Sequence, residues 1–261
     1  MSITFYKYQG TGNDFIIIDQ RDNASRPTQQ TIEAWCHRRM GIGADGLILL
    51  ESSDKAHFFM RYYNADGRES TMCGNGGRCI AAFAIELGLV DAQEIICFEA
   101  VDGMHQARVL KEISNGFEIE LQMQDVTYWR LTLQNELVVH TGSPHFVQIS
   151  QDVKNIDIIH QARAIRYREP FNEEGINVNF IERDNENLLV RTYERGVEDE
   201  TLSCGTGAVA SAIAAQLMMG YTPKTLQTLG GTLSVRFVFD GKRFSDVYLS
   251  GQAVKVFKGF I

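Results

Sequence analysis

Two cysteines of this chain stand in nearly identical glycine frames. Residues 73–76 read Cys-Gly-Asn-Gly, and residues 204–207 read Cys-Gly-Thr-Gly. A run of small apolar residues with helical composition follows each frame, which puts Cys73 and Cys204 at helix starts. The free backbone N–H groups and the helix dipole at such a start favour an anion and lower the pKa of a thiol. Each frame therefore predicts an activated thiol beside a carboxylate-sized anion site.

A pair of such thiols suits one reaction in particular. Inverting a stereocentre by proton transfer needs a base on one face and an acid on the other, and a thiolate with a thiol can serve in either direction. The α-proton of an amino acid is weakly acidic, so N–H groups of the two helix starts would stabilise the developing charge without pyridoxal phosphate. No G-x-G-x-x-G follows a predicted strand, and no G-x-x-x-x-G-K-[ST] is present. We expect no cofactor.

The remaining cysteines, Cys36, Cys79 and Cys97, lie in apolar segments without a glycine frame, so we interpret them as packing residues. No C-x-x-C or H-x-x-x-H pattern accompanies them, and we expect no metal site. The odd total of five cysteines is typical of reduced thiols in the cytoplasm rather than of a disulfide framework.

Composition narrows the function classes. The chain has 261 residues, 44% of them apolar, and a net charge of −8, which argues against a general nucleic-acid or membrane-surface role. The N-terminal sequence lacks the pattern of a signal peptide. No apolar stretch approaches the roughly 20 residues of a membrane span. We expect a cytoplasmic enzyme with a small-molecule substrate.

The sequence repeats itself at an offset close to half its length. The two cysteines are 204 − 73 = 131 residues apart, and three weaker matches keep the same order. These matches pair RYYN (61–64) with RTYE (191–194), GNDFII (12–17) with GSPHFV (142–147), and GADGLIL (43–49) with GINVNFI (175–181). A shared order and offset indicate a duplicated fold.

Most of the chain between these landmarks reads as strands. The predicted strands are residues 15–19, 47–50, 57–63, 94–100, 117–123, 178–182, 188–194, 233–239 and 246–251. We also predict a helix over 31–40 and one after each cysteine frame, ending near Gly88 and near Gly220.

These elements predict an α+β fold of two pseudo-symmetric domains. Each is a curved, mostly antiparallel, barrel-like sheet wrapped around a central helix. The polar, turn-like segment at 112–117 sets the expected boundary. The N-terminal half would be residues 1–115, completed by residues 250–261, and the C-terminal half residues 116–249.

With these motifs the chain resembles the diaminopimelate epimerase family over most of its length. The segments that carry the resemblance are KYQGTGNDFIIID (7–19), HRRMGIGADGLILL (37–50), YYNADGRESTMCGNGGRC (62–79), GSPHFV (142–147), GINVNFI (175–181) and YERGVEDETLSCGTGA (193–208). The resemblance implies cofactor-independent interconversion of LL- and meso-2,6-diaminopimelate, in lysine and cell-wall precursor biosynthesis, by a homodimer.

It also implies roles for individual residues. Cys73 and Cys204 would be the acid and base. The carboxylate at the reacting centre would be bound by Gly74, Asn75, Gly205 and Thr206. The rest of the substrate would be held by Asn13, Asn64, Asn177 and Arg195, with a bidentate contact from Arg195 to the distal carboxylate. Glu194 would face the reacting amino group, and His145 and Glu194 would tune the thiols.

Two positions depart from the family pattern. Ser143 stands where the family usually has asparagine, and because the serine side chain is shorter we expect a distal contact to be lost or water-bridged. The stretch between Gly196 and Cys204 is one residue longer and more acidic than usual. We assign no role to His37, His57, His105, His140 or His160.

Three other functions stay open. A proline or hydroxyproline racemase would use paired cysteines too, but its substrate has a single carboxylate and needs no Arg195. A redox sensor would join Cys73 and Cys204 as a disulfide. A binding module for anionic amino acids would bind diaminopimelate without exchanging its α-proton.

Overall fold

The computed structural model describes residues 2–22, 25–132 and 135–261, which form two compact units. Unit 1 comprises Met1–Leu121 and Gly251–Ile261, and unit 2 comprises Gln122–Ser250. The polar segment at 112–117 is the turn of a hairpin inside unit 1, because the strand that follows it pairs back onto the strand before it. The division therefore falls after Leu121 instead of near residue 115.

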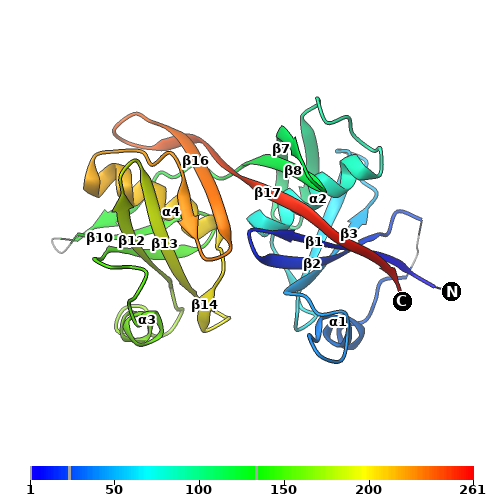
Figure 1. Ribbon diagram of the computed structural model, residues 1–261, viewed down its shortest axis with the longest axis horizontal. Coiled ribbons are helices and arrows are strands. Elements are labelled where there is room, and N and C mark those ends of the chain that lie inside the picture. The colour runs from blue at the N-terminus through cyan, green and yellow to red at the C-terminus, as the bar shows by residue number, and fades with distance from the viewer. Residues whose placement is uncertain (1, 23–24, 133–134) are drawn as a thin grey trace. The chain divides into compact units, whose positions relative to one another are not determined.

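Figure 1 labels many of the elements of the two units. Unit 1 contains β1 (Thr4–Gly10), β2 (Asn13–Asp19), α1 (Gln29–Cys36), β3 (Gly46–Glu51), β4 (Phe58–Asn64), β5 (Glu69–Ser70), α2 (Gly74–Glu86), β6 (Ile96–Ala100), β7 (Gly103–Ile113) and β8 (Gly116–Gln122). Unit 2 contains β9 (Trp129–Leu131), β10 (Glu136–His140), β11 (Pro144–Ile149), α3 (Ile158–Arg166), β12 (Asn177–Asp184), β13 (Asn187–Glu194), β14 (Asp199–Thr201), α4 (Gly205–Ala214), the π-helix η1 (Ala215–Met219), β15 (Leu226–Thr228) and β16 (Gly231–Phe239). The last strand, β17 (Phe244–Phe260), begins in unit 2 and ends in unit 1.

The strands of unit 1 close into a barrel. Antiparallel pairs join β1 to β2, β3 to β4, β6 to β7 and β7 to β8, and parallel pairs join β2 to β3 and β4 to β6. The end of β17 pairs with β8 on one side and with β1 on the other, which completes the ring. Closure leaves no unpaired strand at a sheet edge over this stretch.

Unit 2 repeats the same order of pairing. Strands β10 and β11 are antiparallel, β11 and β12 parallel, β12 and β13 antiparallel, β13 and β15 parallel, and β15 and β16 antiparallel. Helices α3 and α4 follow the strands of unit 2 as α1 and α2 follow those of unit 1. The predicted α+β fold of two duplicated, mostly antiparallel halves is confirmed.

Each unit is built around one small-residue helix. Every residue of α2 from Gly74 to Ala84 is buried, and the helix contacts β1, β2, β3, β4 and β7. Helix α4 is buried in the same way and contacts β10, β11, β12, β13 and β16. Glycine and alanine let strands approach the helix on all sides, since a Cβ at Gly76 would lie 3.1 Å from Ile48 and 3.2 Å from Met60.

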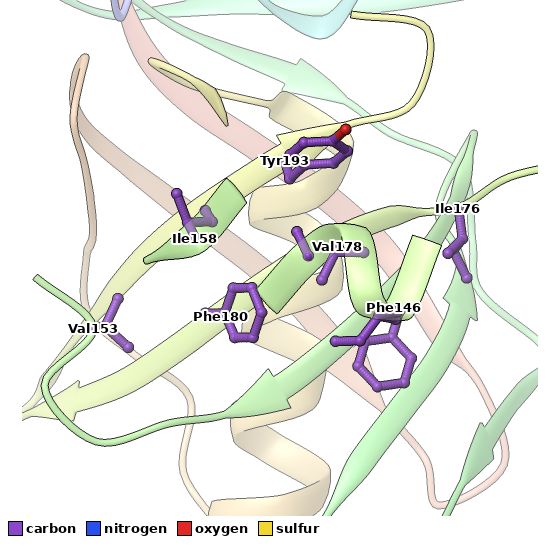
Figure 2. Packing of buried hydrophobic residues seen from close by; sticks show 9 residues of the cluster. Phe146, Val153, Ile158, Ile176, Val178, Phe180 and Tyr193 are labelled. Atoms are coloured by element: carbon purple, nitrogen blue, oxygen red, sulfur yellow. The ribbon is translucent and has the colours of Figure 1, made fainter. Parts of the chain in front are cut away.

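A second helix in each unit covers the outer face of the sheet. In β2 the residues Phe15–Ile18 are all buried, because Ile16 and Ile18 pack with Ile32 of α1 while Phe15 faces α2. Figure 2 shows the corresponding cluster in unit 2, where Ile158 of α3 packs with Val178, Phe180 and Tyr193. Both faces of these strands are therefore apolar.

The helix ends follow local chemistry. Helix α1 stops at Cys36 instead of the predicted residue 40, because His37 adopts extended backbone and its Nδ1 accepts hydrogen bonds from the N–H groups of Arg39 and Met40. Gly88, at φ 69°, ends α2, and Gly220, at φ 71°, ends η1, as predicted. Across the described ranges no helix is long and apolar enough to cross a membrane.

Candidate active site

The two glycine-framed cysteines occupy the same position in their units. Cys73 is the N-cap of α2, and Cys204 is the N-cap of α4, each with extended backbone. The carbonyl of Cys73 accepts the N–H of Gly77 at 2.7 Å, and that of Cys204 accepts the N–H of Ala208 at 2.9 Å. The prediction that both thiols sit at helix starts is confirmed, and the residues after them are the first-turn residues whose N–H groups can bind an anion.

In unit 1, Cys73 belongs to a small group of amides. Its Sγ donates to Oδ1 of Asn13 at 3.6 Å, and Nδ2 of Asn75 donates to the same oxygen at 3.2 Å. Nδ2 of Asn13 donates to the carboxylate of Asp45 at 2.6 Å. Three predicted site residues, Asn13, Cys73 and Asn75, are thus in direct contact.

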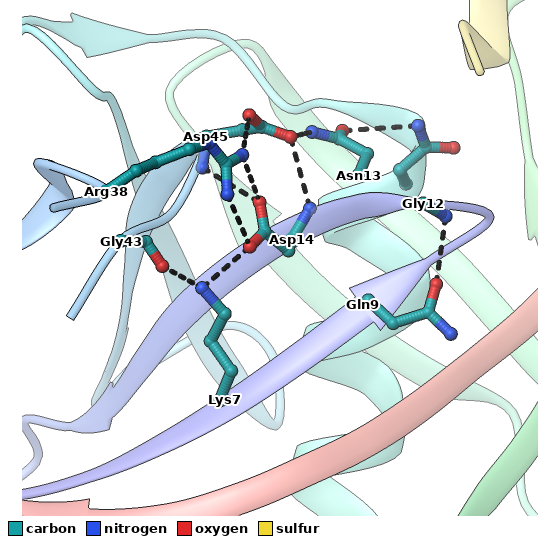
Figure 3. A network of polar contacts seen from close by, with 9 residues as sticks. Lys7, Gln9, Gly12, Asn13, Asp14, Arg38, Gly43 and Asp45 are labelled. Atoms are coloured by element: carbon teal, nitrogen blue, oxygen red, sulfur yellow. Dashed lines mark hydrogen bonds and ion pairs between the residues drawn. The ribbon is translucent and has the colours of Figure 1, made fainter. Parts of the chain in front are cut away.

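Figure 3 shows the charged residues behind Asn13. Asp14 pairs with Lys7 at 2.7 Å and with Arg38 at 2.8 Å, and Arg38 also pairs with Asp45 at 2.6 Å. Burial raises the pKa of Asp14, but the hydrogen bonds from Arg38 and Lys7 outweigh it and lower the pKa to about 2. Two carboxylates and two cations form a balanced network that fixes the start of β2.

Asn64 lies at the end of β4, opposite Gly46 in the sheet. Its backbone N–H donates to the carbonyl of Arg68, and its carbonyl accepts the N–H of Gly67, so it anchors the turn to β5. Within the described part of unit 1, its side chain makes no hydrogen bond to the group around Cys73. Asn64 is the one predicted substrate residue of this unit that the structure leaves apart from that group.

In unit 2, a buried histidine supports the helix start. His145, on β11, is fully buried, and its Nε2 lies 2.9 Å from Oγ1 of Thr206 and 3.1 Å from Oγ of Ser143. Oγ1 of Thr206 lies 3.5 Å from Sγ of Cys204. Burial, followed by the charges of His140 and Arg195, lowers the pKa of His145 to about 3, so the ring is neutral at pH 7.

The tautomer of His145 follows from Asn179, a residue without a role in the sequence analysis. Nδ2 of Asn179 donates to the carbonyl of Phe146 at 3.1 Å, which fixes the orientation of this amide because a carbonyl cannot donate. The same Nδ2 lies 3.0 Å from Nδ1 of His145, which must accept. The proton of the ring is then on Nε2, and it is donated toward Thr206 or Ser143.

The other predicted residues of unit 2 lie around the same strands. Nδ2 of Asn177 donates to Oγ of Ser143 at 3.2 Å, and Oδ1 of Asn177 accepts the N–H of Arg195 at 2.9 Å. The carboxylate of Glu194 accepts a hydrogen bond from Thr201 at 2.8 Å. Ser143, which replaces the usual asparagine, therefore takes part in the hydrogen-bond group of His145 and Asn177.

The pKa of the Cys204 thiol differs from the value expected from the sequence. Burial and then the nearby carboxylate of Glu194 raise its pKa well above the ordinary value, and only the Thr206 hydroxyl and the Gly207 N–H act in the opposite direction. The prediction that the helix start lowers the pKa is wrong for Cys204. The N–H of Gly207 at the helix start lowers this pKa by less than burial beside a carboxylate raises it.

The longer acidic loop before Cys204 has a structural role that sequence reasoning missed. Glu198, at φ 57°, accepts hydrogen bonds from the N–H of Gly196, the hydroxyls of Tyr167 and Tyr193, and the guanidinium of Arg166. These contacts hold the turn that follows Glu194. The unusual length and acidity of this loop were the sequence features that could have indicated this role.

Two of the remaining cysteines are unsuited to catalysis. Burial raises the pKa of Cys36 to about 11 and that of Cys79 to about 12, so both are thiols at neutral pH. Cys97 is half-buried in β6. Over the described ranges, no cluster of three or more His, Cys, Asp or Glu side chains could hold a metal ion.

The fold is shared with proteins of low sequence similarity. A phenazine biosynthesis protein of the PhzF family from Bacillus anthracis matches with a TM-score of 0.73 at 15% identity, covering 100% of this chain and 99% of that one. A hydroxyproline epimerase from Agrobacterium vitis matches with a TM-score of 0.67 at 13% identity, covering 100% of this chain and 92% of that one. These similarities define the class of fold.

Sequence similarity defines the family. The profile of the diaminopimelate epimerase family matches residues 5–125 and 137–256. The diaminopimelate epimerase of Flavobacterium psychrophilum is 46% identical over 259 residues, with 97% of this chain and 98% of that protein covered. The diaminopimelate epimerase of Chlorobaculum tepidum is 41% identical, with 97% and 98% covered. This chain belongs to the diaminopimelate epimerase family.

Proposed function

We propose that this protein is an isomerase that interconverts LL- and meso-2,6-diaminopimelate at the α-carbon, without a cofactor. The observation that carries the proposal is the repeated pairing of a cysteine N-cap with a buried, glycine-rich helix start, Cys73 on α2 and Cys204 on α4. Membership of the family supplies the substrate.

Each thiol has one task in the proposed reaction. One cysteine, as thiolate, removes the α-proton, and the other, as thiol, returns a proton to the opposite face, so the two exchange roles with each turnover. The N–H groups of Gly74, Asn75, Gly205 and Thr206 bind the α-carboxylate and stabilise the carbanionic transition state. No redox step and no covalent intermediate is needed.

The rest of the substrate is held by side chains. Arg195 binds the distal carboxylate with its planar guanidinium, and Asn13, Asn64 and Asn177 bind the other distal groups. Glu194 faces the reacting amino group. The Nε2–H of neutral His145 polarises Thr206, and Ser143 keeps these groups in place, so that the Thr206 hydroxyl can donate to Cys204.

The biological setting belongs to the same proposal. The enzyme acts in the cytoplasm as a homodimer and supplies precursors of lysine and of the cell wall. Its two structural units correspond to two duplicated catalytic halves, each of which contributes one cysteine.

Proton NMR in deuterated water tests the proposal. Reduced protein with LL-diaminopimelate and no added cofactor should lose the α-proton signal and form the meso isomer. Cys73→Ala and Cys204→Ala should each abolish this reaction, while Cys97→Ala, which changes a half-buried thiol outside the site, should keep it.

The alternatives give different results in the same experiment. Exchange with proline but not with diaminopimelate would identify a proline racemase. Binding without any exchange would leave an anionic amino-acid binding module. Near-normal turnover by either cysteine variant would rule out the two-thiol mechanism.

A further inference from the structure

Helix α2 carries a buried cation five residues after Cys73. Arg78 is fully buried, and its guanidinium donates to the carbonyl of Gly74 at 3.3 Å, to Oγ1 of Thr11 at 3.1 Å and to Oδ1 of Asn75 at 2.9 Å. All three acceptors are uncharged, and Nε has no partner. In the described part of the chain no carboxylate pairs with it. A buried charge without a counter-ion is costly, so its position calls for an explanation.

Arg78 fixes the direction of the hydrogen bonds that reach Cys73. Arginine can only donate, so Oδ1 of Asn75 must face it, and Nδ2 of Asn75 then donates to Oδ1 of Asn13 at 3.2 Å. At the other end the carboxylate of Asp45 can only accept, and it takes Nδ2 of Asn13 at 2.6 Å. The two amides between Arg78 and Asp45 therefore have a single orientation, in which Oδ1 of Asn13 lies 3.6 Å from Sγ of Cys73.

Arg78 also brings a charge, without a carboxylate partner among the described residues, into the first turns of the helix that Cys73 caps. Its guanidinium hydrogen-bonds the carbonyl of Gly74 and Oδ1 of Asn75, the two residues that follow this thiol. The network behind Asn13 is balanced, with Asp14 and Asp45 against Lys7 and Arg38.

Two further titratable positions lie beside Cys73. Asp102 accepts the N–H of Met72 at 3.1 Å and lies 3.3 Å from Nε2 of His105, so its negative charge, which acts against that of Arg78, is balanced only when His105 is protonated. Cys79, on the same helix, remains a neutral thiol because burial raises its pKa to about 12.

The duplicated half lacks this cation and has an anion instead. At the offset of the cysteines, Arg78 corresponds to Val209, which is buried in α4. In the matching strand ends of β4 and β13, neutral Asn64 corresponds to Glu194. Helix α2 thus has a guanidinium where α4 has an alkyl group, and the strand β13 ends in a carboxylate where the corresponding strand β4 ends in an amide.

We propose that Arg78 is a positioning residue that makes Cys73 the more acidic of the two site thiols, so that the free protein holds a thiolate at Cys73 and a thiol at Cys204. A nearby cation stabilises a thiolate, and a nearby carboxylate opposes one. The carbonyl oxygen of Asn13 favours the thiol form of Cys73, but it is a neutral dipole acting over a long hydrogen bond and is outweighed by a full charge. The inference states which of the two thiols is ionised before substrate binds. Its relevance to catalysis rests on the two-thiol mechanism of the proposed function.

Alkylation of the free protein tests the inference without substrate. Iodoacetamide is added between pH 5 and pH 10, and mass spectrometry of peptides gives the rate at each cysteine. The midpoint of each pH profile reports ionisation, whereas accessibility changes only the height of the profile. The midpoint of Cys73 should lie below that of Cys204.

Variants separate the effect of the Arg78 charge on the midpoints from the effect of its packing. Arg78→Gln should raise the Cys73 midpoint by about one pH unit or more, which slows alkylation about tenfold at a fixed pH below the midpoint. Arg78→Lys, which keeps the charge, should restore most of the difference. Glu194→Gln should lower the Cys204 midpoint. Arg68→Gln, at an exposed arginine of the same unit, is the control for net charge and should change neither.

A lower midpoint at Cys204 in the unchanged protein, or an unmoved Cys73 midpoint in Arg78→Gln, would overturn the inference. If Arg78→Gln does not fold, the order of midpoints in the unchanged protein and in Glu194→Gln still decides. If the midpoint of Cys204 lies below that of Cys73 and the protein still epimerises diaminopimelate, this inference alone is rejected. If the midpoint of Cys73 is the lower one but no epimerisation occurs, the proposed function alone is rejected.

Discussion

Replacing Gly207 by alanine should disturb the second half-site selectively. Gly207 is the third residue of α4, and a Cβ there would lie 2.6 Å from Oδ1 of Asn179 and 3.2 Å from Cβ of Cys204. Asn179 is fully buried and cannot simply swing away, because it is bonded to Thr192 at 2.9 Å, His145 at 3.0 Å and Phe146 at 3.1 Å. The substitution therefore removes the contact that fixes the tautomer of His145.

The magnitude follows from these contacts. Three hydrogen bonds at about 1 kcal/mol each are weakened, while alanine in place of glycine returns about 1 kcal/mol of helix propensity. The net loss is about 2 kcal/mol in the free energy of unfolding, or roughly 4–8 °C in Tm for a chain of this size. Urea unfolding measures the stability, and α-proton exchange measures the activity, which should fall at least tenfold.

The first half supplies a matched control. Gly76 is the corresponding residue of α2, but a Cβ there meets the terminal methyl groups of Ile48 at 3.1 Å and Met60 at 3.2 Å, which can shift. The free energy of unfolding of Gly76→Ala should therefore stay within about 1 kcal/mol of that of the unchanged protein, because the higher helix propensity of alanine offsets the crowding. Equal effects of the two substitutions, or a Gly207→Ala protein with full stability and activity, would refute the reasoning.

Two other predictions concern charged residues. Because the pKa of Asp14 falls from 3.8 to about 2 on folding, its stabilisation is complete above pH 4 and is lost as the pH falls toward 2. The difference in unfolding free energy between the unchanged protein and Asp14→Asn, measured in urea, should shrink by about 2 kcal/mol between pH 5 and pH 2; a constant difference would contradict this. Glu198→Gln should raise the KM for diaminopimelate roughly tenfold with little change in kcat, since it loosens the turn that carries Arg195. Unchanged KM in steady-state assays would remove Glu198 from that role.

Periodicity and motif spacing predicted much of the fold. The cysteine frames, the glycines that end the helices and the apolar strand runs each depend on local sequence, so their positions in the structure agree with the predictions. The predicted helix ends four residues beyond Cys36, the end of α1, because no local pattern signalled that the ring of His37 would accept backbone N–H groups.

The supporting residues of the site were harder to find. Asn179 and Arg78 stand inside motifs that were recognised, but their function depends on contacts with distant segments such as Thr192 and Thr11. The raised pKa of Cys204 was missed for a similar reason. Burial beside Glu194 is a tertiary property, whereas the helix start is a local one.

The path of β17 has a consequence for the order in which the protein can fold on the ribosome. Residues 251–261 fill the gap between β8 and β1, so the barrel of unit 1 stays open until these residues have left the ribosome. Pairs such as Thr4 with Phe260 join residues that are far apart in the sequence, and forming them requires closure of a very long loop. Unit 1 therefore cannot be finished before unit 2 has been synthesised, and a nascent chain without residues 251–261 would expose strand edges to a chaperone or to a neighbouring chain.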